Sequence, residues 1–254
     1  MTSDNHQSEH AKKEHTLTTR NESLTIPLAI VFSGLLIAGA IIFSGSGKSA
    51  GAQPVAQQLP ETGSALPLEE QLKKLAINSD DHVLGNPDAP VVIVEYSDTQ
   101  CPFCLRFHAS MNQAISEYGA SGKIAWVHRH WPLEQIHENA RSQAHALECA
   151  NELAGKEAFW KYLDAIFTTE ATAVPDLKQL AVAQGIDGNT FVSCQESKKY
   201  NARIDKDLAE GAELGVRGTP YTLIVNQKTK KILPVNGALP YPQLKAQIEL
   251  ALTK

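Results

Sequence analysis

Two of the four cysteines lie three positions apart, in the segment Cys101-Pro102-Phe103-Cys104. A cysteine pair at this spacing supports two kinds of chemistry, thiol–disulfide exchange and the binding of a zinc ion. A zinc site would need a second pair of ligands, and neither Cys149 nor Cys194 has a Cys or His two to five residues after it. His145 lies one helical turn before Cys149, but one His and one Cys do not complete a site. The pair therefore indicates a redox centre with no metal.

The residues around the pair predict a strand followed by a helix. Val91 to Tyr96 is a β-branched apolar run, long enough for a buried central strand. After the pair, apolar residues recur every three or four positions, which is typical of one helix face. This set comprises Cys104, Phe107, Met111, Ile115 and Tyr118.

This arrangement gives the two thiols different roles. Pro102 suits the first position of a helix, which makes Cys101 the capping residue. The unpaired backbone N–H groups and the helix dipole favour negative charge there, so we expect Cys101 to be exposed and ionised. Cys104 lies one turn further on the apolar face and should be buried. Cys101 would then form a mixed disulfide with a substrate, and Cys104 would resolve it.

The other elements define the fold class. A second strand is predicted at Ile124 to His130, a long helical stretch at about 138–214, and a final helix at Gln243 to Leu252. Tyr221 to Val225 and Lys231 to Val235 read as an antiparallel hairpin. The order predicts an α/β, thioredoxin-like fold with a large helical insert. Before it, a short helix is expected at Leu68 to Leu75.

The N-terminal part predicts a membrane anchor. Residues 24–43 are uncharged and apolar, about the length that a bilayer core requires. Basic residues precede this segment, so residues 1–23 are expected to be a cytoplasmic tail. Residues 44–67 read as a flexible tether to a domain at 80–254. The alternative is a cleaved signal peptide, and both interpretations place the domain outside the cytoplasm.

Composition excludes one function class. The formal net charge is −5 and no cluster of Lys and Arg is present, which argues against nucleic-acid binding. The nine histidines, His108 among them, have no role assigned from the sequence. No cofactor is expected, because the cysteine pair itself carries two electrons.

Several segments resemble the DsbA-like thioredoxin-fold family over about residues 80–254. They are Gly85 to Pro90, the run VVIVEYSDTQCPFC, residues 129–133 (RHWPL) and residues 216–220 (VRGTP). In that family the proline after the insert is cis and lies against the redox disulfide, and Pro220 matches it. Thr219 would then pair through its backbone with a substrate strand.

The resemblance also implies roles for three further residues. Glu95 matches a buried acid that would have a raised pKa and exchange protons with Cys104; the alternative is a strand-end carboxylate that reaches water. Members of the family carry a disulfide within the insert, which favours a structural Cys149–Cys194 bond. A second redox pair and two separate buried thiols are the alternatives.

The sequence favours a tethered, monomeric enzyme at the cytoplasmic membrane, with its domain in the periplasm or outside the cell. It would oxidise cysteine pairs in unfolded or partly folded exported proteins and be reoxidised by a quinone-linked membrane partner, as the resemblance implies. Phe103 brings no charge between the cysteines, so a reductase supplied by a membrane thiol carrier is the alternative direction. A non-enzymatic binding module with the same fold is the hypothesis from another class.

Overall fold

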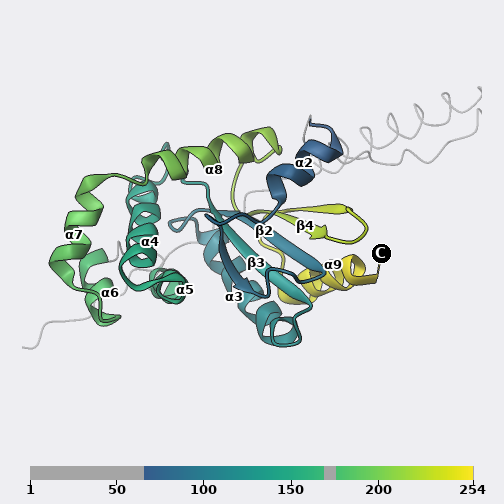
Figure 1. Ribbon diagram of the computed structural model, residues 1–254, viewed down its shortest axis with the longest axis horizontal. Coiled ribbons are helices and arrows are strands. Elements are labelled where there is room, and N and C mark those ends of the chain that lie inside the picture. The colour runs from purple at the N-terminus through teal and green to yellow at the C-terminus, as the bar shows by residue number, and fades with distance from the viewer. Residues whose placement is uncertain (1–65, 169–175, 254) are drawn as a thin grey trace, which may run out of the picture. The chain divides into compact units, whose positions relative to one another are not determined.

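The computed structural model describes residues 66–168 and 176–253 (Figure 1). The predicted tail, the membrane segment at 24–43 and nearly all of the tether lie outside the described residues, so these remain predictions. Within the described ranges, no helix is long and apolar enough to cross a bilayer.

A five-stranded mixed sheet forms the centre of the described part, in the order β1-β3-β2-β4-β5. The strands are β1 (His82–Gly85), β2 (Val91–Ser97), β3 (Ile124–His130), β4 (Tyr221–Asn226) and β5 (Ile232–Asn236). β2 and β3 are parallel and the other neighbours are antiparallel. Every residue of β2 is buried, as expected for a β-branched run in the central strand of a covered sheet.

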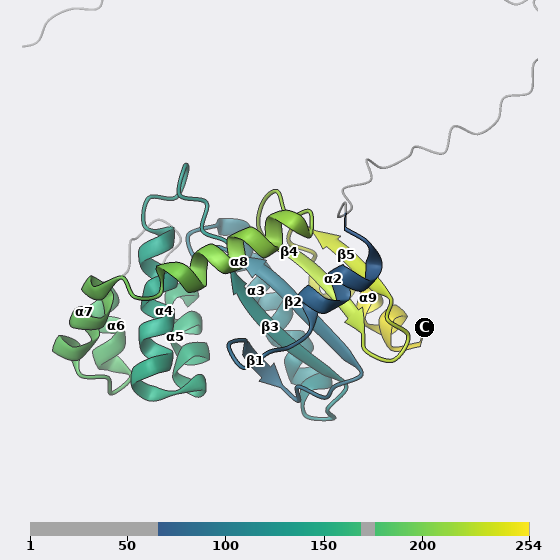
Figure 2. The same ribbon diagram turned by 45° about the horizontal axis from the view of Figure 1, so that its top comes forward.

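Helices cover both faces of the sheet (Figures 1 and 2). One face packs against α3 (Pro102–Ala114), its π-helical extension (Ile115–Gly119) and α9 (Tyr241–Thr253). The other face is covered by α2 (Leu68–Leu75) and by the segment that follows α8 (Asn201–Glu213). Since odd-numbered residues of β2 point to the first face, Glu95 shares that face with α3.

The helical insert lies between β3 and β4, as predicted. It consists of α4 (Ala140–Ala154), α5 (Lys156–Thr168), α6 (Leu177–Ala183), α7 (Gly188–Ser197) and α8. Two of these helices begin at identifiable signals: Asp176 and Asp187 cap the N-termini of α6 and α7 by accepting backbone N–H groups. The insert therefore folds as separate helices that pack on one another, with α4 against α5 and α7.

Two features were not predicted. The edge strand β1 was missed because it has only four residues and is half exposed, which leaves no clear periodicity. The π-helical turn at Ile115–Gly119 was also missed, because the apolar spacing alone does not distinguish it from a continued α-helix. The predicted α2 helix and the second strand agree with the structure at both ends.

Candidate active site

Cys101 and Cys104 lie where the central strand gives way to α3. Cys101 is the residue before the first helical turn, with an extended backbone, and Pro102 is the first helical residue. Both cysteines are free thiols, and Cys104 is fully buried. The expectation that Cys101 is exposed was wrong, since only 4% of its surface is accessible. Its Sγ donates to the carbonyl oxygen of Thr219 at 3.6 Å, so a segment distant in sequence lies against it.

The pKa values of the two thiols are shifted in opposite directions. The pKa of Cys101 is lowered to about 5, mainly by a hydrogen bond from the Cys104 thiol. Burial opposes this effect, while Thr219 and the backbone N–H groups of Phe103 and Cys104 strengthen it. The pKa of Cys104 is raised well above its usual value, first by burial and then by its bond to Cys101 and by the charge of Glu95. Cys101 is therefore the thiol that ionises more readily, and Cys104 holds its proton more tightly.

Asp98 holds the turn that leads into the cysteine pair. Its carboxylate accepts the backbone N–H of Gln100 at 2.7 Å, the backbone N–H of Leu133 at 2.8 Å and Nδ1 of His137 at 2.7 Å. Its own backbone N–H points to Sγ of Cys104 at 3.5 Å. Sequence reasoning did not identify this residue, because its partners Leu133 and His137 lie far along the chain.

Thr219 and Pro220 form the opposite wall of the site. The peptide bond between them is cis, and Pro220 is buried directly before β4. A pocket of about 240 Å³ adjoins this segment and is lined by Arg217, Thr219, Pro220 and Asn236, among others. The segment that the sequence singled out therefore lies beside Cys101 and borders an open pocket.

Glu95 is buried on the same face of the sheet as Cys104. Only 1% of its surface is accessible, and Nε1 of Trp126 donates to its Oε2 at 2.9 Å. Burial raises the pKa of Glu95 to about 7, while Ser97, His108 and Trp126 lower it. The alternative of a carboxylate that reaches water is therefore wrong, and at neutral pH Glu95 can both hold and release a proton.

Glu95 belongs to a row of buried polar residues that runs across four strands of the sheet. His82, His128, Glu95 and Thr222 are successive partners on β1, β3, β2 and β4, and all four are buried. Both ring nitrogens of His128 have no hydrogen-bond partner among the described residues, and burial lowers its pKa well below the usual value. The alternation of His128 and His130 in an apolar strand was the signal in the sequence that these rings share one face.

One buried cluster has the residue types of a metal site. Nε2 of His82 and Nε2 of His130 lie 2.9 and 2.8 Å from the same Glu148 oxygen. The Arg203 guanidinium lies 3.8 Å from that oxygen. A fixed cation thus already balances the carboxylate and would repel a metal ion, and the two imidazoles satisfy it by hydrogen bonding. We therefore interpret the cluster as structural.

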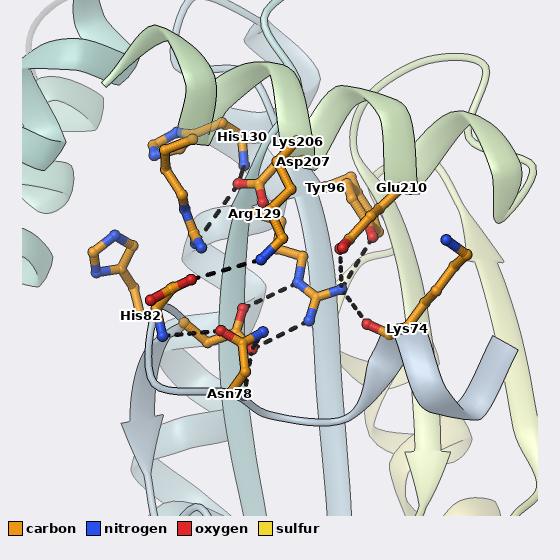
Figure 3. A network of polar contacts seen from close by, with 12 residues as sticks. Lys74, Asn78, His82, Tyr96, Arg129, His130, Lys206, Asp207 and Glu210 are labelled. Atoms are coloured by element: carbon orange, nitrogen blue, oxygen red, sulfur yellow. Dashed lines mark hydrogen bonds and ion pairs between the residues drawn. The ribbon is translucent and has the colours of Figure 1, made fainter. Parts of the chain in front are cut away.

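A second buried network joins the N-terminal helix to the sheet and insert (Figure 3). The Arg129 guanidinium binds the Asp81 carboxylate in a bidentate pair at 3.1 and 3.2 Å. It also donates to the backbone oxygen of Lys74 and to the Tyr96 hydroxyl, and it lies 3.6 Å from Glu210. These contacts hold β3 in place beside the site without touching either thiol.

Cys149 of α4 and Cys194 of α7 form a disulfide within the insert. Since both cysteines belong to helices of the insert, the bond joins these helices to one another. The structure therefore contains the bond that the resemblance implied, and it holds this pair apart from the two free thiols of the site.

Comparisons with known proteins agree with this geometry. The family model described as Thioredoxin (Thioredoxin_4) matches residues 78–249. Pseudomonas aeruginosa DsbA2 has a similar structure, with a TM-score of 0.58 and 25% identity over 68% of this chain and 96% of that one. BdbD from Bacillus subtilis has a TM-score of 0.59 and 21% identity over 68% of this chain and 94% of that one. The predicted resemblance to the DsbA-like family is confirmed.

Curated relatives are much longer proteins. The Na(+)/H(+) antiporter NhaA 1 of Mycolicibacterium gilvum is 36% identical over 152 residues, which is 58% of this chain but 24% of the antiporter. A protein with the same name from Mycolicibacterium vanbaalenii is 36% identical over 150 residues, 23% of its length. The match thus spans about a quarter of these relatives.

Proposed function

Because the chain belongs to the thioredoxin family, we propose that it is a thiol–disulfide oxidoreductase that oxidises cysteine pairs in other proteins through Cys101 and Cys104. The observation that carries the proposal is the opposite displacement of the two thiol pKa values at the start of α3. Two thiols with different pKa values react in a defined order. The one with the lower pKa attacks or leaves as a thiolate, while the one with the higher pKa stays protonated until the second step.

In the oxidising direction, a substrate thiolate attacks Sγ of Cys101 in the Cys101–Cys104 disulfide. The bond between the two enzyme sulfurs breaks, and Cys104 leaves and takes a proton from Glu95. The second substrate thiolate then attacks the substrate sulfur of the mixed disulfide. Cys101 leaves as a thiolate, for which its low pKa makes it a good leaving group. Two electrons pass from the substrate to the enzyme pair.

Regeneration runs the same chemistry against an oxidised partner. The Cys101 thiolate attacks the partner disulfide, Cys104 gives its proton to Glu95, and the Cys104 thiolate then attacks Cys101 to release the reduced partner. Thr219 supports the binding of either partner, because its backbone carbonyl oxygen lies 3.6 Å from Sγ of Cys101 and the residue also borders an open pocket. Glu95 thus takes up and releases one proton in each cycle.

The acidity of Cys101 supports the oxidising direction. A stabilised thiolate stabilises the reduced enzyme and so makes its disulfide a stronger oxidant. The redox equilibrium of the protein with glutathione tests this, with the Cys149–Cys194 bond verified separately. A potential near −120 mV, typical of DsbA itself, would support an oxidase, whereas roughly −230 mV or below would favour the reductase.

Trapping the covalent intermediate tests the enzymatic class itself. A Cys104→Ser variant should accumulate a mixed disulfide with a substrate peptide, because the resolving thiol is absent. A Cys101→Ser variant should form none. If Cys101→Ser leaves every function of the protein unchanged, the chain is a binding module and the proposal is wrong.

We further propose that residues 24–43 anchor the domain to the cytoplasmic membrane with the domain outside the cytoplasm. Unfolded exported proteins would then be its substrates, and a quinone-linked membrane protein its oxidant. The uncharged apolar run supports this proposal. Cell fractionation with protease accessibility of the domain in intact spheroplasts tests it. Sodium–proton exchange is the named activity of proteins about four times longer than the matched segment, and it forms no part of the proposal.

A further inference from the structure

Glu95 is shielded from the solvent, although the proposed cycle protonates and deprotonates it once. Its accessible surface is 1%, and its neighbours on the sheet face, Ser97, Trp126, His128 and Thr222, are equally buried. The Trp126 indole donates to the carboxylate but cannot accept a proton from it. A buried acid of this kind needs a polar side chain that links it to the surface.

His108 lies in the right place for such a link. It follows Cys104 by one helical turn, so both side chains project from the same face of α3. Its ring packs 5.3 Å from the Trp126 ring, which is bonded to Glu95, and 4.7 Å from the Phe167 ring of α5. Its Nδ1 is buried with no hydrogen-bond partner among the described residues.

Asp164 of α5 connects His108 to the solvent. Nε2 of His108 lies 2.6 Å from Oδ1 of Asp164, whose side chain is 53% exposed. Asn112 also reaches this oxygen, at 3.4 Å. Partial burial works to raise the pKa of Asp164, but its bond to His108 and the charge of His108 leave it lowered. The His108 imidazole thus contacts Trp126, the partner of Glu95, on one side and the solvent-exposed Asp164 carboxylate on the other.

We propose that His108 and Asp164 form the route by which protons pass between Glu95 and the solvent, an inference that rests on the proposed thiol–disulfide exchange. When Cys104 resolves a mixed disulfide, its proton goes to Glu95, from Glu95 to one nitrogen of His108, and from the other nitrogen to Asp164 and water. When Cys104 leaves the disulfide, the proton returns along the same groups. No electrons move along this route.

The groups around His108 are consistent with this role. Glu95 comes from β2, Trp126 and His128 from β3, Asp164 and Phe167 from α5, and Asn112 from its own helix. Among these, Asp164 alone is both ionisable and open to water. An imidazole can accept at one nitrogen while it donates from the other, which neither indole nor amide can do.

The test uses the full-length protein and an Asp164→Asn variant, which leaves the buried His108 in place. Rapid mixing with a model substrate disulfide separates formation of the mixed disulfide by Cys101 from its resolution by Cys104. Asp164→Asn should leave the first rate unchanged and slow the second by at least about tenfold, part of the roughly 100-fold or more that general acid–base catalysis contributes. Added imidazole buffer should restore it. His108→Gln should show the same pattern.

Glu157→Gln is the matched control, because it makes the same change of carboxylate to amide on an exposed position of α5. It should alter neither rate nor the response to imidazole. If Asp164→Asn resolves the mixed disulfide at the wild-type rate across the pH range, the relay is wrong while the proposed function stands. If the wild-type protein forms no mixed disulfide, the proposed function and the relay both fail.

Discussion

Cys101 owes its acidity to contacts that come from both sides of the site. One side is local, where the backbone N–H groups at the start of α3 and the Cys104 thiol stabilise the thiolate. The other side is Thr219, which lies 118 positions further along the chain. The environment that lowers the pKa of Cys101 is therefore complete only when the segment before β4 packs over the start of the helix.

Removing the Thr219 hydroxyl should make Cys101 less acidic. Thr219→Val keeps the size of the side chain and the backbone carbonyl but removes the hydroxyl, to which part of the lowered pKa of Cys101 is due. The pKa of Cys101 should rise by about one unit, the equivalent of a hydrogen bond to a charged group. Thiolate absorbance across a pH titration measures this. Thr222→Val, a buried threonine of β4, is the control, and an equal pKa in both variants would contradict the assignment.

Glu95 should make the fold less stable as the pH rises. Its pKa is about 7 in the folded protein and near 4.5 when unfolded, so the folded state holds the proton more tightly. The stabilisation is complete below about pH 4.5 and is lost as the pH rises through 7, a change of about 3 kcal/mol. Glu95→Gln removes this titration.

Urea unfolding of the oxidised protein measures the effect without titration of the thiols. Wild type should lose about 3 kcal/mol relative to Glu95→Gln between about pH 4 and pH 8. A stability difference that does not vary with pH would mean that Glu95 is accessible to water in solution.

At the scale of elements, two adjacent residues of α4 hold the insert in place, one by contact with the sheet and one by a bond to α7. Glu148 accepts from His82 of β1 and His130 of β3, and Cys149 is bonded to Cys194 of α7. The two contacts serve different purposes, since Glu148 aligns the insert with the site and the disulfide holds the insert's own helices together.

Removing the disulfide should therefore destabilise the protein without changing its chemistry. A Cys149→Ala, Cys194→Ala double variant opens a loop of 45 residues. The chain-entropy model predicts a loss of about 4 kcal/mol, seen as a lower urea midpoint. The reactivity of Cys101 with a substrate disulfide should be unchanged. A changed rate would show that the insert's geometry controls the thiol.

At the scale of the whole described molecule, Arg129 connects parts that are far apart in sequence. Its guanidinium contacts α2, the loop before β1, β2 and α8 (Figure 3). The accessible surface of Arg129 and of Asp81 is 1% each, so this ion pair is deeply buried. Removal of one partner would leave the other charge unpaired in the interior.

Asp81→Asn should cost about 3–5 kcal/mol of stability for this reason. Arg129→Met should cost a similar amount, while the double variant should cost clearly less than the sum, because no unpaired charge remains. Chemical unfolding of the three variants and wild type forms a double-mutant cycle. Additive losses would show that the two side chains do not interact in solution.

The local features of this protein could be predicted from its amino-acid sequence. The apolar run of β2, the helical spacing after Cys104 and Pro102 at the first helical position all act within a few residues, so they could be predicted from neighbours. The order of elements predicted the sheet and the insert for the same reason. The short edge strand β1 was missed, because its structure depends on pairing with β3.

The environment of the site became apparent only from the folded structure. Burial of Glu95, the lowered pKa of Cys101 and the packing of His108 on the Trp126 ring depend on partners from other strands and helices, most of them tens of residues away. Alternation along a strand shows which side chains share a face, but not which strand pairs with which. Free energies of ionisation depend on those neighbours and on the loss of water, and both are set only when the chain has folded.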